Sequence, residues 1–351
     1  MKLNNLIYQF AHWETWPYLV KYIPIAPLWF WFCARAGSFW FFTPSNPTLT
    51  FGGFEGESKN EMYLQLPPGS FPDSILVSHK LTFVEACSIV EGNLAFPFAV
   101  KPDVGMMGFM FRKIENQQQF EQYHSVMEVD YIIQHYVDYP LEVSVFYYRY
   151  PNELSGHITG FIRKEFLQVT GNGVATLLEL IAQYPRVRFR IEEMKLKHEK
   201  KLNDIIPAGE RYCLSYAMNL SRGGKLVSLA HEKDGRLLKV FDEISRYTKY
   251  FYYGRYDIKC LSIEDLRLGK NFLILEYNGS GAEPHHIYGN SNTLLQAYRV
   301  VLHHWNVLYK ISKHNHQDGL KYWTFVSGLR FLKKANKHFR ALKKLDTTFE
   351  I

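Results

Sequence analysis

The sequence predicts an α+β (α/β) fold, in which short strands and helices are mixed along one chain. Three observations support this class. Apolar runs with the length of strands are interspersed with segments whose apolar residues recur at helical spacing. Apolar residues make up 47% of the chain and charged residues 21%, as in an ordinary globular protein. The mixture of strands and helices argues against a solenoid or a helical bundle, and the chain has no internal repeat and no low-complexity segment.

The chain has 351 residues, enough for one large or two to three small domains. We expect an aromatic N-terminal part, a short mixed part, a longer mixed part and a basic helical tail. The predicted boundaries are 1–75, 76–138, 139–315 and 316–351.

The aromatic part contains the apolar run Ile25–Phe42, whose eighteen residues are roughly the minimum for a membrane span. Arg35 lies within it and is costly in hydrocarbon, and Gly37 and Ser38 interrupt it. We therefore expect a buried core or subunit contact first, attachment at a membrane interface second, and a true span third. The basic tail favours the second reading somewhat, because aromatic and cationic residues together suit an anionic membrane surface.

A glycine-rich loop at 51–59 leads into a predicted helix, Asn60–Gln65, which ends at Pro67-Pro68-Gly69. In the loop, Glu57-Ser58-Lys59 could bind a substrate carboxylate or a phosphate at the start of the helix. The alternatives are that Ser58 caps the helix or that the segment is a solvated turn.

The two mixed parts show the alternation of elements most clearly. Residues 76–138 read as strand, helix, strand, strand, helix, strand. Later strands and helices are predicted from β-rich runs and from helical spacing of apolar residues. The predicted strands include 98–100, 109–111, 131–134, 142–150, 158–167 and the run that ends on Glu276-Tyr277-Asn278; the predicted helices include 114–127, 175–183, 237–251 and 294–314.

The net charge is +7, and the excess is concentrated near the C-terminus. Between Lys310 and Lys344 there are ten Lys or Arg residues and one acid, Asp318. Such a tail could contact anionic lipid, nucleic acid or an acidic partner, or it could be a solvated helix face.

The four cysteines are widely scattered and none forms a C-x-x-C pair. This arrangement argues against a zinc site or a disulfide framework and favours a reducing compartment. No signal peptide is apparent, so we expect a cytoplasmic protein, with possible peripheral contact at the inner face of the membrane.

Three oxygen-bearing side chains form the most informative cluster. Glu276 and Asn278 end one predicted strand and point to the same face, because side chains alternate along a strand. Asp257 lies upstream in Gly254-Arg255-Tyr256-Asp257. Two carboxylates and an amide oxygen suit Mg²⁺, which usually takes its remaining ligands from nucleotide phosphates. The pattern therefore predicts that the chain handles ATP.

Three further motifs are individually weak. Lys101 precedes a loop containing Gly105 and Gly108, where a lysine and successive backbone N–H groups could bind phosphate. Ile132–Val137, followed by Glu142, could hold a nucleoside or could be a plain strand and turn. Lys164 precedes Thr170-Gly171-Asn172-Gly173, which could bind an anion at a helix start or could be an ordinary turn.

Taken in order, these motifs resemble the ATP-grasp superfamily, in particular its D-alanine–D-alanine ligase-like carboxylate–amine ligases. The set is K-P-D-x-G-x-x-G, I-I-Q-x-Y-V-x(4)-E, K-E-x(4)-T-G-N-G-x-x-T-L-x-E-L-I, G-R-x-D and E-x-N-G. The third motif and Asn219–Gly224 are also similar to segments of cyanophycin synthetase and ribosomal-protein glutamate ligases. The resemblance covers roughly residues 76–310 and implies two α+β lobes that clasp ATP, with 76–138 as the small lobe and 139–315 as the large lobe.

The resemblance implies roles for the matching residues. Lys101 would contact the α- and β-phosphates, and the loop from Gly105 to Gly108 would close over them as a lid. Glu142 would bind the ribose, and Lys164 would be a second phosphate lysine. Arg255 would steady an acyl phosphate or tetrahedral intermediate, with Arg222 facing the same site. The adenine would lie against Gln134, His135, Tyr136 and Val137, and two Mg²⁺ ions would be held by Asp257, Glu276 and Asn278.

The implied activity is ATP-dependent formation of an amide or peptide-like bond from an acid and an amine, which are small molecules or peptides, without a nucleic-acid partner. The family's first lysine has only Lys80 as a loose counterpart, and the N-terminal part does not match the family's usual preceding domain. His285 and His286 follow the metal motif and could serve in proton transfer or in packing. The alternatives are a non-catalytic nucleotide-binding protein at a membrane surface, and a phosphotransferase of the same fold.

Overall fold

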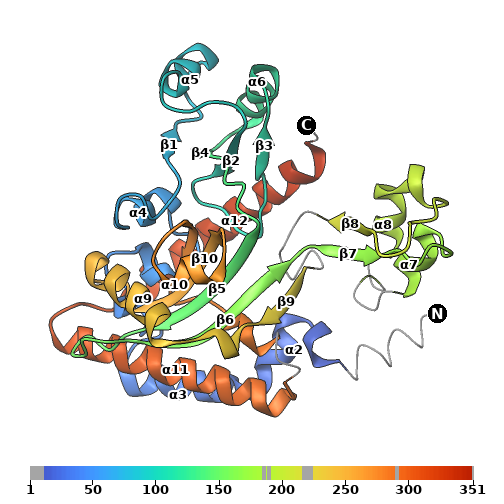
Figure 1. Ribbon diagram of the computed structural model, residues 1–351. Helices are drawn as coiled ribbons and strands as arrows, with labels where there is room; N and C mark the ends of the chain where they lie inside the picture. The colour runs from blue at the N-terminus through green and yellow to red at the C-terminus, as the bar shows by residue number, and fades with distance from the viewer. Residues whose placement is uncertain (1–11, 184–186, 188–190, 216–223, 289–291, 350–351) are drawn as a thin grey trace.

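The computed structural model describes residues 12–183, 187, 191–215, 224–288 and 292–349. Two antiparallel sheets form the body of the protein, and a small separate unit projects to one side (Figure 1). The mixture of helices and antiparallel sheets confirms the α+β class predicted from the sequence.

The small sheet has four strands in the order β1-β4-β2-β3, and every neighbouring pair is antiparallel. Helices α5 and α6 contribute Ala86, Phe120 and Tyr123 to its hydrophobic core. The same core includes Phe339 of the C-terminal helix α12. The elements are β1 (Ser74–Val77), α5 (Phe83–Val90), β2 (Phe98–Pro102), β3 (Arg112–Ile114), α6 (Gln117–Val126), β4 (Tyr131–His135) and α12 (Phe325–Thr348).

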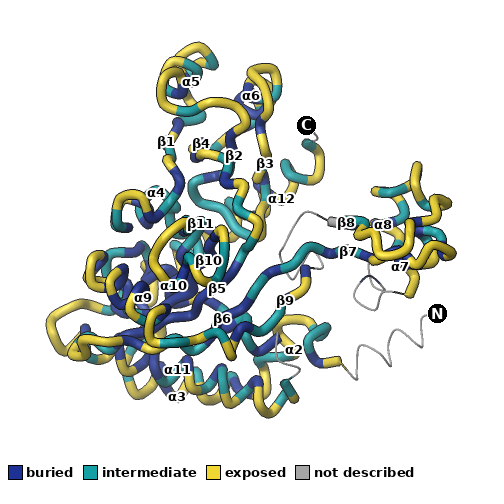
Figure 2. The backbone as a smooth tube through the Cα atoms, viewed as in Figure 1, coloured by how far each residue is buried: buried dark blue, intermediate teal, exposed yellow. Residues whose placement is uncertain are grey.

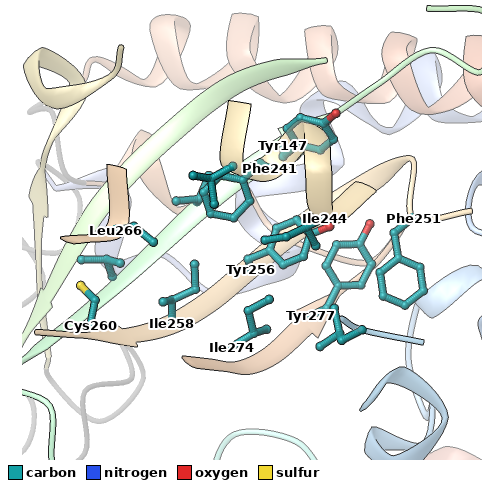
Figure 3. Packing of buried hydrophobic residues seen from close by; sticks show 14 of the residues in the cluster. Tyr147, Phe241, Ile244, Phe251, Tyr256, Ile258, Cys260, Leu266, Ile274 and Tyr277 are labelled. Carbon is teal, nitrogen blue, oxygen red and sulfur yellow. The ribbon is translucent and has the colours of Figure 1, made fainter. Parts of the chain in front are cut away.

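The large sheet has five strands in the order β11-β10-β5-β6-β9, again all antiparallel. Helix α9 covers one face, where Phe241 and Ile244 pack with Tyr147, Tyr256 and Tyr277 (Figure 3). The elements are β5 (Leu141–Tyr148), β6 (His157–Glu165), β9 (Lys225–Ser228), α9 (Gly235–Thr248), β10 (Tyr253–Cys260), α10 (Ile263–Arg267) and β11 (Phe272–Asn278).

This packing decides which side chains reach the opposite face. Tyr256 and Tyr277 are buried against α9, and side chains alternate along a strand. Their neighbours in sequence, Arg255, Asp257 and Glu276, are therefore directed to the other face of the large sheet.

The aromatic N-terminal part packs largely against helix α11 and the large sheet. Phe41, Phe42 and Phe51 are almost completely buried in a cluster with residues of α11. Asn46 ties this segment to the large sheet, because its side chain donates to Tyr253 O and accepts from the backbone N–H groups of Tyr252 and Tyr253. The helices are α2 (Tyr18–Tyr22), α3 (Ala26–Ala36), α4 (Lys59–Tyr63) and α11 (Leu294–Gln317). Short 3₁₀ turns of this part lie at Trp13–Thr15, Ile23–Ile25, Thr43–Ser45 and Thr50–Gly53. Elsewhere in the described residues, 3₁₀ turns lie at Glu199–Lys201, Ala230–Glu232 and His285–Ile287.

The projecting unit has a two-stranded sheet and a hydrophobic core of its own (Figure 1). Leu177, Ile181, Met194 and Leu214 are buried in that core. The elements are β7 (Leu167–Thr170), α7 (Leu177–Gln183), α8 (Ile191–Lys197) and β8 (Arg211–Ser215).

Several predicted boundaries move, and one predicted strand is wrong. Residues 109–111 form turns, and the strand begins only at Arg112, because Gly108 and Met110 adopt positive φ angles of 71° and 55° that interrupt extended backbone. The helix predicted from 114 begins at Gln117, where the Asn116 side chain accepts from Gln119 N.

No helix among the described residues is long and apolar enough to cross a membrane.

Candidate active site

The candidate site lies on the face of the large sheet opposite α9. In the antiparallel register, Arg255 is paired with Asn278 and Asp257 with Glu276. On the other side of β10, Asp257 is paired with Ser144 of β5. The strand order therefore brings together the three residues predicted to hold a metal, although β10 and β11 are separated in sequence by α10.

Asp257 is the most heavily bonded residue of the site. Arg255 donates to it twice, from Nε to Oδ1 and from Nη2 to Oδ2, each at 3.1 Å. It also accepts from Ser144 Oγ and, at 3.2 Å, from Asn278 Nδ2. Burial alone would raise the pKa of the Asp257 carboxyl, but the charges of Arg255 and Lys164 more than offset this and hold the pKa far below its usual range.

Lys164 extends the ion cluster to the neighbouring strands. Its Nζ lies 3.1 Å from Glu142 Oε1 and 3.2 Å from Asp257 Oδ1. Glu142 and Lys164 face each other across the β5–β6 pair. Burial by itself would lower the pKa of Lys164, but the two carboxylates raise it, so the ammonium stays charged.

Glu276 pairs with a lysine from the aromatic N-terminal part. Lys59 Nζ lies 3.0 Å from Glu276 Oε1 and also donates to the carbonyl oxygen of Gly105 at 3.0 Å. Burial opposes ionisation of Glu276, yet the charge of Lys59 leaves its pKa below the usual value. Lys59 therefore joins the predicted metal strand to the predicted lid.

Lys101 reaches the same region from the small sheet. Its Nζ donates to Tyr63 Oη at 2.8 Å, to Gln134 Oε1 at 3.1 Å and to the Leu275 carbonyl at 3.2 Å. Burial, together with the nearby charge of Lys59, lowers the pKa of Lys101 to about 7. The two sheets thus place Lys101 beside the strand that ends in Glu276 and Asn278.

The predicted lid is the connection between β2 and β3, and contacts hold it at both ends. Gly105 O accepts from Lys59, while Val104 O accepts from His338 Nε2 at 2.6 Å. At its far end, Met110 N donates to Asp346 Oδ1 at 2.8 Å. Gly108 has a φ of 71°, a conformation that favours glycine.

The predicted adenine-binding segment links the small sheet to the large one. Gln134 belongs to β4 and is flanked by β1 and β2, and its side chain bonds to Lys101 and Ser74. His135 N donates to Asp73 O. Beyond β4, Tyr136 is partly exposed, whereas the carbonyl of Val137 accepts from Lys259 Nζ at 2.9 Å.

His285 lies beside the arginine of the ion cluster. Arg255 Nη1 approaches His285 Nε2 at 3.2 Å, so Nε2 accepts and the ring proton resides on Nδ1, which has no partner among the described residues. Burial, followed by the charge of Arg255, lowers the pKa of His285 well below its usual value. The neutral ring borders a small hollow with Ser144 and His286.

Some predicted residues lie elsewhere. Arg222 falls within 216–223, outside the described residues. The Thr170–Gly173 loop belongs to the projecting unit, apart from both sheets (Figure 1). A Cβ at Gly171 would approach the carbonyl oxygens of Ile206 and Pro207 to 2.3–2.4 Å, so this glycine is needed for close packing. Lys80 is exposed in the turn between β1 and α5.

Sequence reasoning missed Ser144 and Tyr63. Ser144 could have been found, because it lies two residues after Glu142 and so shares its face of the strand. Tyr63 carries no comparable pattern. Of the alternatives at 57–59, helix capping by Ser58 is observed, since its Oγ accepts from Glu61 N at 3.0 Å.

The oxygen atoms present fit a magnesium site in part. Glu276 Oε1 is paired with Lys59, while Oε2 has no hydrogen-bond partner in the described part of the chain. Asn278 uses its amide nitrogen, which leaves its oxygen for a ligand. Both oxygens of Asp257 already accept from Arg255, so Asp257 would join a metal only by sharing them. The described residues contain no cluster of three or more His, Cys, Asp or Glu side chains suited to a metal, so the amide oxygen would be needed as a third ligand.

Comparison with known proteins gives matches at the level of structure alone. No family model and no curated protein sequence matches the chain. Among solved structures, a bifunctional glutathione synthetase from Pasteurella multocida matches 72% of this chain and 38% of its own, at 15% identity and a TM-score of 0.43. A D-alanine–D-alanine ligase from Bacillus anthracis matches 75% of this chain and 69% of its own, at 14% identity and a TM-score of 0.41.

The VanG D-Ala:D-Ser ligase from Enterococcus faecalis matches 72% of this chain and 61% of its own, at 14% identity and a TM-score of 0.40. This chain spans well under half the length of the glutathione synthetase chain, of which 38% is matched. These three structures are at most 15% identical to this chain, with TM-scores of at most 0.43.

Proposed function

We propose that this chain is an ATP-grasp ligase that joins a carboxylic acid to an amine at the expense of ATP, releasing ADP and phosphate. The observation that carries the proposal is the charged cluster between the two sheets. Four cations, Lys59, Lys101, Lys164 and Arg255, lie around the carboxylates Glu142, Asp257 and Glu276. The order of the sequence motifs that supply these residues, Lys59 excepted, supports the same activity.

A cluster of buried lysine and arginine side chains suits a polyphosphate. In this proposal Lys101 and Lys59 leave their protein partners to contact phosphate oxygens, and the lid closes over them. Charge neutralisation and positioning supply most of the catalysis of phosphoryl transfer. A closed lid would also keep water from hydrolysing an activated acid.

The nucleoside would lie along the connection between β4 and β5. Because Gln134 is enclosed by two strands, Tyr136 and Val137 are the part of the predicted segment best placed to meet a base. Glu142 is the second residue of the next strand, β5, and could accept from ribose hydroxyls once Lys164 turns toward phosphate.

Magnesium would be held by Glu276 and Asn278, with Asp257 sharing its oxygens. Bound Mg²⁺ would neutralise charge on the β- and γ-phosphates. Asp257 also orients Arg255, because it accepts two hydrogen bonds from the guanidinium group.

Ligation follows from these parts in two steps. A carboxylate oxygen of the acid attacks the γ-phosphorus, and the bond to the β-phosphate oxygen breaks, giving an acyl phosphate and ADP. The amine then attacks the acyl carbon, the bond to the phosphate oxygen breaks, and the amine loses a proton. Arg255 would steady the charged intermediate, and the proton would leave with the departing phosphate.

The test is ADP release screened over mixtures of amino acids, dipeptides and hydroxy acids. Glu276→Gln keeps the shape of the side chain but removes its charge, so we expect turnover to fall by about 10²-fold or more while the far-ultraviolet circular dichroism stays unchanged.

Glu243→Gln is the matched control, because Glu243 is exposed on α9, which covers the other face of the large sheet. Full activity of Glu276→Gln would refute the metal assignment. Failure of the unmodified protein to bind ATP, or to release ADP with any acid and amine, would refute the ligase proposal. A phosphorylated product without ligation would identify a phosphotransferase instead.

A further inference from the structure

One surface of the protein exposes large apolar side chains that the core does not use. Six residues from α3, the loop after it and the first turns of α12 are 39% to 60% exposed. Ring contacts connect Phe30 to Phe39 at 6.2 Å and Phe39 to Phe325 at 5.6 Å, so the patch is continuous across the two segments. We call it the aromatic face; its members are Phe30, Trp31, Phe39, Phe325, Val326 and Leu329.

The aromatic face is built on α3, the loop after it and the start of α12. Helix α3 packs against α11, and exposed stretches along α3 appear in yellow in Figure 2. Contiguous apolar surface of this kind is uncommon on a monomer and marks a contact with a partner or a membrane. Trp and Phe are also the side chains that suit the boundary between water and lipid.

The segments that form this face carry charged side chains of one sign. Residues 15–54 contain no Asp or Glu, and neither do residues 319–345. Arg35 is exposed and stacks 4.7 Å from the centre of the Trp31 ring, so a cation stands at the edge of the aromatic face.

Helix α12 continues the aromatic face into a row of cations. After Val326 and Leu329, its exposed side includes Arg330, Lys333, Lys337 and Arg340 at helical spacing. Lys333, Lys337 and Arg340 line one surface hollow with Asn336. The opposite side of the same helix is buried against the small sheet, which fixes the direction in which these cations point.

We propose that the aromatic face and the cationic row of α12 together dock the protein on an anionic lipid bilayer. The apolar rings would enter the boundary between headgroups and acyl chains, and the row of cations would lie over acidic headgroups. This inference does not depend on the ligase proposal, because it rests on residues remote from the charged cluster between the sheets.

A second copy of this chain is the competing occupant. Two copies meeting through this surface would bring their acid-free cationic segments toward each other, which like-charge repulsion opposes. A bilayer containing acidic lipid supplies the opposite charge, and this complementarity favours lipid over self-association.

The experiment is sedimentation of the full chain with vesicles of phosphatidylcholine, with and without phosphatidylserine. We expect binding only when phosphatidylserine is present, and binding that weakens as salt is added. The double variant Lys333→Gln with Lys337→Gln should weaken binding on the order of tenfold. The double variant Phe30→Ser with Val326→Ser should weaken it to a similar extent, since it removes apolar surface.

Matched controls carry the same substitutions at exposed positions elsewhere. Lys200→Gln with Lys270→Gln controls for charge, and Leu154→Ser with Leu196→Ser controls for apolar exposure. Circular dichroism and thermal melting of every variant confirm that it is folded.

Three results would overturn the proposal. They are absence of binding to either vesicle, equal loss of binding in the control variants, and a dimer in sedimentation velocity that Phe30→Ser with Val326→Ser dissociates while vesicles bind nothing. Selective loss in the two test variants alone would support it.

Discussion

Lys59 connects two parts of the candidate site. It comes from the N-terminal part, yet it contacts both Glu276 and the carbonyl of Gly105. If Lys59 binds a phosphate, as proposed, its contact with the carbonyl of Gly105 in the predicted lid would change as well. In this proposal Lys59 is part of the active site, although it lies outside the segment that resembles the ATP-grasp family.

Removing the charge of Lys59 is expected to slow ADP release. Lys59→Met should lower kcat for ADP release on the order of 10²-fold, since one charge-stabilising group is removed. Lys59→Arg should recover part of the rate, and Lys80→Met, at an exposed position, should be silent. Unchanged kcat in Lys59→Met would exclude Lys59 from the active site.

The second prediction concerns protonation of Lys101. Because burial lowers its pKa to about 7, part of the population is neutral at neutral pH. Phosphate favours the charged form, so ATP binding should take up protons, and ATP affinity should fall as the pH rises above 7. Calorimetric titration at roughly pH 8, in buffers of different ionisation enthalpy, measures that uptake at a pH where the γ-phosphate is already ionised.

Lys101→Met should abolish the proton uptake. Proton uptake that persists in this variant would belong to another group.

The lowered pKa of Lys101 also affects the stability of the protein. Between about pH 7 and the ordinary pKa of lysine, the unfolded chain binds more protons at this position than the folded chain. The contribution of Lys101 to the free energy of unfolding therefore increases with pH across this range.

At the scale of elements, α12 shows how one helix can serve two surfaces. Its charged residues identify the basic tail in the sequence, but Ala335, Phe339 and Leu342 recur at helical spacing and are buried against the small sheet. Asp346, near its end, accepts from Met110 N and Arg112 Nη1. The tail is thus an integral part of the small-sheet core and supports the lid.

We predict that Phe339→Ala destabilises the protein by about 3–5 kcal/mol, because it leaves a cavity in that core. Lys343→Ala, at an exposed position of the same helix, should change stability by less than about 0.5 kcal/mol. Denaturant unfolding of both variants measures the difference. Equal stability would show that α12 does not pack as described.

At the scale of the whole molecule, the projecting unit has a hydrophobic core separate from the cores of the two sheets. Clusters of buried residues from the N-terminal part join the large sheet, whereas residues 167–214 form a cluster of their own. Leu167 and Ser215 are paired at the base of the projecting unit, so the chain enters and leaves it at neighbouring points.

We therefore predict that replacing residues 168–214 with an Asn-Gly turn leaves the thermal unfolding of the two-sheet body cooperative and within a few degrees of the intact protein. ATP binding should persist, because the charged cluster lies outside the removed segment. A protein that fails to fold, or that no longer binds ATP, would show that the projecting unit is part of the nucleotide site or of the main core.

The sequence by itself determined the α+β class and much of the charged cluster. Strand periodicity alone places Glu276 and Asn278 on one face, and local motifs identify Lys101, Lys164 and Asp257. That Glu276 and Asn278 share a face can be predicted because side-chain direction within a strand is a local property.

Only the tertiary structure decided the partners of those residues. Nothing near Lys59 in the sequence points to Glu276, and nothing near Asp257 shows that Arg255 occupies both of its oxygens. The burial of one side of α12 likewise depends on which sheet it meets. Contacts between distant segments follow from the packing of whole elements, which local periodicity does not encode.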